Sequence, residues 1–146
     1  MTNLAKRGPL GLKTTPAPKA PRKGVKPISD KRRAHRASEA GQAGLEHMRD
    51  VKSLPCAACG CLDNSEAHHC RDMPPQHYRW LYHRIPGAGM KSADTDTIPL
   101  CPECHTDGPA SFHGNREDFH RLYGADYLYI LPTRAQVAAM HGEIDY

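Results

Sequence analysis

The sequence predicts a small α+β domain that is cross-linked through four cysteines and preceded by a basic arm. Three observations lead to this prediction: two separated Cys-x-x-Cys pairs, two short segments of strand type and an uneven distribution of charge. The chain has 146 residues, of which 38% are hydrophobic, and it contains only 2 Phe, 6 Tyr and 1 Trp. We therefore expect one domain with a small apolar core.

The basic residues are concentrated at the N-terminus. Residues 1–37 contain 11 of the 20 Lys and Arg and a single acid, which gives a net charge of +10, whereas residues 38–146 carry a net charge of −6. Residues 1–28 are rich in Lys, Arg, Pro, Gly and Thr and have no apolar periodicity. We expect this arm to be disordered, because it cannot bury enough surface to offset the entropy of ordering.

No segment resembles a membrane span or a secretory signal. The apolar run at residues 127–131 is far too short to cross a bilayer, and no apolar run follows the basic N-terminus. A cytoplasmic location is expected, where cysteines are more often metal ligands than disulfide partners.

The elements of the folded part can be placed in order. A helical linker is expected over residues 29–52, which lack proline and begin with Ser29 as an N-cap. Gly41 and Gly44 each weaken this helix by about 1 kcal/mol relative to alanine. Residues 53–146 are expected to form the domain, with strands at residues 66–70 and 97–100.

The two expected strands are separated by 26 residues, a length typical of functional or disordered connections. A short helix is expected within it, at residues 76–83. Another helix is expected to begin after Pro102. The last two are expected from Asn115 to Leu122, before Gly124, and from Thr133 to His141, before Gly142.

The Cys-x-x-Cys pairs are Cys56/Cys59 and Cys101/Cys104. Two such pairs complete a tetrahedral zinc site, and the 41 residues between them mean that the site would join distant segments. Such a site would supply much of the folding energy of a small domain. Coincidental free thiols are the alternative. Cys61 and Cys70 are expected to be small, partly buried apolar residues, although either could replace a ligand.

Three histidines lie near these cysteines in the sequence. His68 and His69 are adjacent on an expected strand, so their side chains should either point to opposite faces or diverge around a bulge. His105 directly follows Cys104. Imidazoles can bind a divalent metal or accept a proton from water, and these three are candidates for a second site. We expect His120 on a helix face, and His35, His47 and His141 in solvent.

Together these residues resemble the zinc-containing branch of the HNH endonucleases, in particular phage and prophage members such as the recombination-enhancement nucleases, which also have a long basic N-terminal segment. The resemblance covers about residues 52–124. It rests on Leu54-Pro-Cys-x-x-Cys59, His68-His69, Gly87-x-Gly-Met90, Asp96-Thr-Ile-Pro-Leu-Cys101-x-x-Cys104-His105 and Phe119-x-x-x-Tyr-Gly124.

The resemblance implies a ββα-metal fold and a metal-dependent DNA endonuclease of low sequence specificity, acting in the cytoplasm of a bacterial host. His69 would be the general base, and His68 and His105 would hold a catalytic Mg²⁺ or Mn²⁺. The site formed by the four paired cysteines would hold structural Zn²⁺. A recombinase filament is a partner implied by the resemblance alone, and the oligomeric state is not readable from the sequence.

Two assignments remain open at this stage. Asp96 occupies the position of the family's Asn, which braces the hairpin loop and helps to orient the base, but an Asp cannot donate as an Asn does. Asp94 is its rival for this role. His113 is a second candidate ligand of the catalytic ion, and a surface histidine is the alternative.

Basic residues of the arm and of the long connection are expected to contact DNA phosphates. They are Lys6, Arg7, Arg22, Lys23, Lys31, Arg32, Arg33, Arg79 and Arg84. A solvated leader is the alternative for the arm. Trp80 would either stack on bases or, with Leu81, cap the core.

Two other functions compete with the nuclease. A non-catalytic zinc module that binds nucleic acid would use the histidines structurally. A zinc-stabilised protein-interaction module would use the arm only as a leader.

Overall fold

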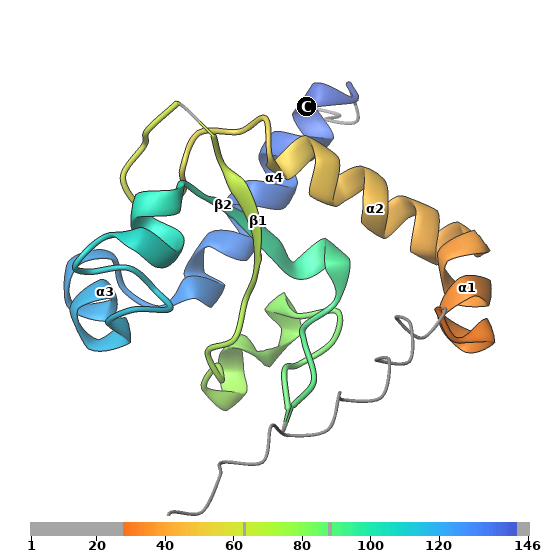
Figure 1. Cartoon of the computed structure of the whole chain (residues 1–146), viewed down its shortest axis with the longest axis horizontal. Helices are drawn as coiled ribbons and strands as arrows, with labels where there is room; N and C mark the ends of the chain where they lie inside the picture. The colour runs from red at the N-terminus through yellow and green to blue at the C-terminus, as the bar shows by residue number, and fades with distance from the viewer. Residues whose placement is uncertain (1–27, 63, 88, 143–146) are drawn as a thin grey trace, which may run out of the picture.

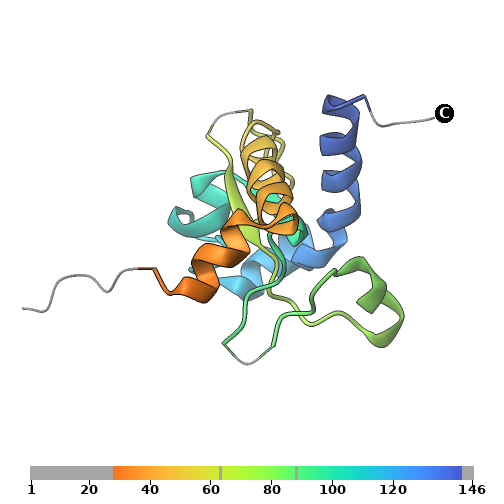
Figure 2. The ribbon, with the colours of Figure 1, turned by 90° about the vertical axis from the view of Figure 1, so that its right-hand side faces the viewer.

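The computed structural model describes residues 28–62, 64–87 and 89–142, and it begins with two helices, α1 (Asp30–Ala37) and α2 (Glu39–Val51). Ser29 caps α1 as expected. Ser38 ends α1 and caps α2, its hydroxyl accepting the N–H of Gly41 at 3.2 Å. The helix expected over residues 29–52 is therefore interrupted, because a serine side chain competes for helical backbone groups. Figures 1 and 2 show the resulting bend.

The sheet has two antiparallel strands, β1 (Glu66–His69) and β2 (Thr97–Leu100), close to the expected ranges. Their register pairs His68 with Ile98 and His69 with Thr97. Both α2 and α4 (Ile130–Met140) contact the sheet, and α3 (Arg116–Tyr123) lies on the other side of it in Figure 1. This arrangement confirms the predicted small α+β class.

The connection between the strands contains two short 3₁₀ helices, η1 (Gln76–Leu81) and η2 (Asp94–Asp96). The helix expected at residues 76–83 is thus present in a tighter form. Leu81 is buried, whereas Trp80 is 65% exposed. Of the two interpretations of this region, capping of the core therefore applies to Leu81 only.

The C-terminal helices appear in the predicted order, and α3 has the predicted caps. A π-helical turn, η3 (Glu103–Asp107), comes after Pro102, and α3 lies between the N-cap Asn115 and Gly124, whose φ is 80°. The 3₁₀ helix η4 (Asp126–Tyr129) leads into α4, which begins at Ile130 rather than at the expected Thr133. The earlier start is possible because Pro132 lies in the first turn, where a backbone N–H is not needed.

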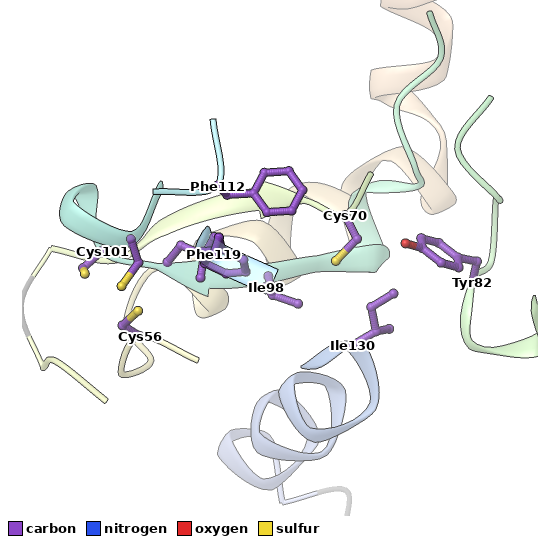
Figure 3. Close-up of a cluster of buried hydrophobic side chains, with 10 residues drawn as sticks. Cys56, Cys70, Tyr82, Ile98, Cys101, Phe112, Phe119 and Ile130 are labelled. Carbon is purple, nitrogen blue, oxygen red and sulfur yellow. The ribbon is translucent and has the colours of Figure 1, made fainter. Parts of the chain in front are cut away.

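The apolar core is small and ends at the cysteines (Figure 3). Phe112 and Phe119, the two phenylalanines of the chain, pack edge to face with their ring centroids 5.3 Å apart. Ile98 and Ile130 are completely buried beside them. In the part of the chain that the structure describes, no helix has the length and apolar character needed to cross a membrane.

Candidate metal centres and a basic cleft

The four cysteines of the two Cys-x-x-Cys pairs converge at one end of the core. The first pair lies in the turn after α2, where the N–H of Gly60 donates to the Cys56 carbonyl at 2.8 Å and Gly60 has a φ of 74°. The N–H of Ala57 donates to the Pro99 carbonyl at 2.8 Å and so holds this turn against β2. The second pair lies where β2 continues into η3.

The geometry of this cysteine cluster (Cys56, Cys59, Cys101 and Cys104) fits a tetrahedral metal. One sulfur atom from each residue lies within 4.8 Å of the other three, and the Cys59 and Cys101 sulfurs are 3.7 Å apart. Zinc–sulfur bonds of about 2.3 Å at tetrahedral angles place two sulfurs about 3.8 Å apart. The cluster can therefore hold a metal, and zinc suits its donors.

The thiols of the cysteine cluster differ in acidity. Burial raises the pKa of Cys56, but N–H groups of neighbouring residues outweigh this effect and lower its pKa to about 7. Burial raises the pKa of Cys101 to about 11 and also raises that of Cys104. All four thiols can become thiolates only if a cation compensates their charge, and a bound divalent metal would do so.

The remaining cysteines stay outside this cluster. Cys61 is exposed, contrary to the expectation of partial burial. It contributes to the turn through its backbone, since its carbonyl oxygen accepts the N–H of Cys56 at 2.8 Å. Cys70 is fully buried, and its thiol donates to the Asp126 carbonyl oxygen at 3.7 Å. Burial raises the pKa of Cys70 well above its usual value.

Three imidazoles form a second group of candidate ligands, the histidine cluster (His68, His105 and His113). One ring nitrogen of each lies within 4.8 Å of the others, and the ring centroids are 4.9 to 5.3 Å apart. The segment after η3 folds back through an N–H bond from His113 to the His105 carbonyl at 3.0 Å. The structure thus brings His113 to the two histidines that the sequence favoured.

Two carboxylates hold rings of the histidine cluster in place. Asp126 is fully buried, and its Oδ2 lies 3.2 Å from Nε2 of His68. Glu66 Oε2 bonds Nδ1 of His105. Each contact leaves the other ring nitrogen available, which is how carboxylates orient histidine ligands in metal sites.

Two rings of this cluster, those of His68 and His113, are kept neutral. Burial, with the neighbouring His105, lowers the pKa of His68 to about 3, and burial with His68 lowers that of His113 to about 4. Phe112 covers His68 with 4.4 Å between the ring centroids. Neutral imidazole is the form that binds a metal, so the cluster is suited to a divalent ion.

His69 points away from the histidine cluster, as the alternation of β1 predicts. Its Nε2 lies 2.9 Å from Oδ1 of Asp94. Asp96 is fully buried and instead accepts backbone N–H bonds from His83, Arg84 and Ala93 at 3.0 to 3.1 Å. The two tasks that the resemblance assigns to one Asn are thus divided, since Asp94 contacts His69 and Asp96 braces the loop.

Arg134 of α4 adds a charge to the bracing contact. Its guanidinium pairs with the Asp96 carboxylate and donates to the Thr95 carbonyl at 3.1 Å. The loop that carries Asp94 is therefore tied to the C-terminal helix.

His69 and Asp94 line a cleft of about 470 Å³ between the N-terminal helices and the long connection, here called the basic cleft. Its lining residues are Arg32, His35, Arg36, Gly41, Leu45, Met48, His69, Arg84, Lys91 and Asp94.

The residues predicted to bind nucleic acid are only partly gathered there. Arg32 and Arg84 line the basic cleft, whereas Lys31 and Arg33 are exposed elsewhere on α1, and Arg79 is exposed on η1. The other four, Lys6, Arg7, Arg22 and Lys23, lie outside the described residues, as does the arm up to residue 27.

Sequence reasoning missed several members of these sites. Arg36 follows Arg32 at helical spacing, a signal that could have identified it. Asp126 could not be found in this way, because 58 residues separate it from His68.

Three other histidines have structural contacts. His47 was expected in solvent but is buried, since it lies on the face of α2 that packs on the sheet. His141 was also expected in solvent, and its Nε2 lies 2.8 Å from an Asp50 carboxylate oxygen. His120 Nε2 lies 2.8 Å from Asp72 Oδ2.

Comparisons of the chain with protein-family models, with curated proteins and with solved structures give no match.

Proposed function

We propose that this protein is a metal-dependent endonuclease of the HNH type that hydrolyses DNA phosphodiester bonds with little sequence preference. The observation that carries the proposal is the position of His69. This imidazole is paired with a carboxylate inside a basic cleft, and the preceding residue in the strand belongs to the histidine cluster. The candidate base would thus be adjacent in the chain to a ligand of the candidate catalytic ion.

The cysteine cluster would hold a structural Zn²⁺. It joins the turn after α2 to the end of β2, so the ion would secure the strand on which the second site depends. With a core this small, metal binding would contribute directly to the free energy of folding.

The histidine cluster would hold the catalytic ion. That ion, when bound, supplies Lewis-acid stabilisation of charge on the phosphate and on the leaving oxygen. Because Mg²⁺ prefers oxygen ligands, an all-imidazole donor set suits Mn²⁺ better. Asp126 and Glu66 would keep the rings of His68 and His105 in their binding orientation.

His69 would accept a proton from the attacking water. Asp94 would stabilise the imidazolium that forms and hold the ring in one orientation, since its carboxylate is already 2.9 Å from Nε2. Asp96 would act at a distance by keeping the loop in shape.

Cleavage of single-stranded, duplex and branched DNA by the zinc-loaded protein with Mn²⁺ or Mg²⁺ tests this proposal. His69→Ala should reduce cleavage by about 10²- to 10⁴-fold, the range that a general base contributes, while zinc content and DNA binding remain. His77→Ala, which alters an exposed histidine on η1, is the matched control and should cleave normally.

Two results would count against the enzyme. If the intact protein cuts none of these DNA forms with either ion, the nuclease proposal is wrong. If the protein then still binds DNA, the histidines have a structural role in a non-catalytic zinc module.

A further inference from the structure

We infer that the basic cleft is a binding track for one nucleic-acid strand, in which α1 supplies one wall, Arg84 and Lys91 supply the other and His69 lies between them. The identity of the polyanion rests on the proposed function. The track itself is argued from charge and packing, and it is tested by binding rather than by cleavage.

The charges of the basic cleft are largely uncompensated. Arg32, Arg36, Arg84 and Lys91 line it, against one acid, Asp94, which is already bonded to His69. Among the described residues, none of these four cations forms an ion pair. Such a concentration of positive charge around a concave surface favours an anionic chain with regularly spaced phosphates.

Arg84 is fixed in position on its wall. Its Nε and Nη2 donate to the carbonyl oxygens of Lys91 and Ser92 at 3.1 and 2.9 Å. These bonds hold the guanidinium without neutralising it, so that its charge is preorganised for a phosphate.

The opposite wall depends on α1, a helix that buries none of its residues. Apolar burial therefore does not explain why α1 bends against the first turn of α2 (Figures 1 and 2). A β-carbon at Gly41 would overlap the His35 carbonyl oxygen, so the close approach of the two helices requires glycine there. The result of this approach is that Arg32 and Arg36, one helical turn apart, line the same cleft as His69.

A second cleft continues the positive surface. It has a volume of about 460 Å³, and Arg71, Arg116 and Lys91 are among its lining residues. Lys91 also lines the basic cleft, so the two clefts meet at this lysine. Arg116, which also pairs with Asp72 at 3.4 Å, lies over the Phe112 ring, 4.4 Å from its centroid. That ring packs against His68 and His113, which places the second cleft beside the histidine cluster. A strand in the track would thus pass from His69 toward the candidate metal ligands.

The test compares two double variants of equal charge, made in the full-length zinc-loaded protein without added Mn²⁺ or Mg²⁺. Arg32→Ala/Arg36→Ala removes two cations that line the basic cleft. Lys31→Ala/Arg33→Ala removes two cations of the same exposed helix that the sequence alone also predicts to contact phosphates. Neither lines the cleft, and Arg33 is already paired with Asp30. A fluorescein-labelled single-stranded oligonucleotide is the probe, titrated at several salt concentrations.

We expect the cleft variant to weaken binding at least tenfold, and the control variant less than threefold. The slope of log K against log salt should fall in magnitude by about 1.4 for the cleft variant, since each phosphate contact to a single strand contributes about 0.7. Equal losses in both variants would overturn the track, because net charge alone would then account for binding. No loss in either variant would also overturn it, because the cations of the cleft would then not contact the strand.

Gly41→Ala tests the geometry without removing a charge. The added methyl group should push α1 away and weaken binding toward the level of the cleft variant, while circular dichroism and zinc content stay unchanged. If this variant folds and binds the oligonucleotide as tightly as the parent protein does, binding does not require the close approach of α1 to α2. If it fails to fold, the two charge variants still decide the question.

The outcomes separate the track from the proposed enzyme. If the protein binds DNA through the basic cleft but never cleaves it, the track is supported and the nuclease proposal is wrong. If the protein cleaves DNA but both double variants bind DNA equally well, the nuclease proposal is supported and the track is wrong.

Discussion

Gly44 of α2 lies directly against Asp94, so that a β-carbon at position 44 would be 2.9 Å from the Asp94 Cβ and 3.3 Å from its Oδ2. Asp94 in turn bonds His69. The absence of a side chain on α2 therefore sets the position of the carboxylate that orients the candidate base.

Gly44→Ala should displace Asp94 and lower the cleavage rate, although alanine favours the helix by about 1 kcal/mol. Cleavage kinetics and thermal unfolding of this variant would be measured together. If the effect passes through Asp94, adding Gly44→Ala to Asp94→Ala should cause little further loss. Wild-type cleavage by the Gly44→Ala protein would show that Asp94 tolerates the displacement.

Cys56→Ser should release the metal of the cysteine cluster and abolish cooperative unfolding, because a structural site contributes folding free energy. Metal content and circular dichroism during heating provide the measurement. Cys61→Ser is the control, since Cys61 is exposed and outside the cluster, and it should behave as the parent. A stable, folded, zinc-free Cys56→Ser protein would refute the assignment.

Asp126→Asn should weaken Mn²⁺ binding at the histidine cluster by about 10- to 100-fold, the cost of losing a carboxylate partner of a histidine ligand. Calorimetric titration of the zinc-loaded protein with Mn²⁺ measures this affinity. Zinc content should not change. Glu66→Gln is a companion variant with a smaller expected effect, since Glu66 is exposed. Unchanged Mn²⁺ affinity in both variants would exclude the positioning role of these carboxylates.

His47→Gln should reduce the loss of stability in mild acid. Burial lowers the pKa of His47 below 6.5, so the unfolded chain binds this proton more readily than the folded protein does. The free energy of unfolding should therefore fall as the pH drops through about 6.5, and less steeply in the variant. Urea unfolding between pH 7 and 5 would show this, and identical slopes would mean that His47 does not contribute.

The parts of the fold that the sequence predicted depend on local signals. Asn115 and Gly124 mark the two ends of α3, because capping depends on residues within one helical turn. The spacing within each Cys-x-x-Cys pair is likewise set by the single turn that contains it. The contacts that were missed join distant segments. No local sequence pattern predicts that Asp126 pairs with His68. None predicts that His47 is buried.

Gly41 and Gly44 show how a local rule can mislead. Considered in isolation, each glycine weakens a helix, and the sequence alone predicts only that effect. In the folded chain the first glycine permits α1 to approach α2 and the second permits α2 to approach Asp94. Glycine is kept at both positions, although it weakens the helix, because the close packing leaves no space for a methyl group.

The cysteine cluster and the pairing of β1 with β2 have a consequence for how this protein can diversify. Together they fasten both ends of the connection at residues 71–96, which supplies Asp94 and much of the positive surface. Lengthening a loop whose ends are fixed adds only about 0.6 kcal/mol of closure entropy per doubling. Insertions there would alter the surface that we propose binds nucleic acid, while the residues of both candidate metal centres stay where they are.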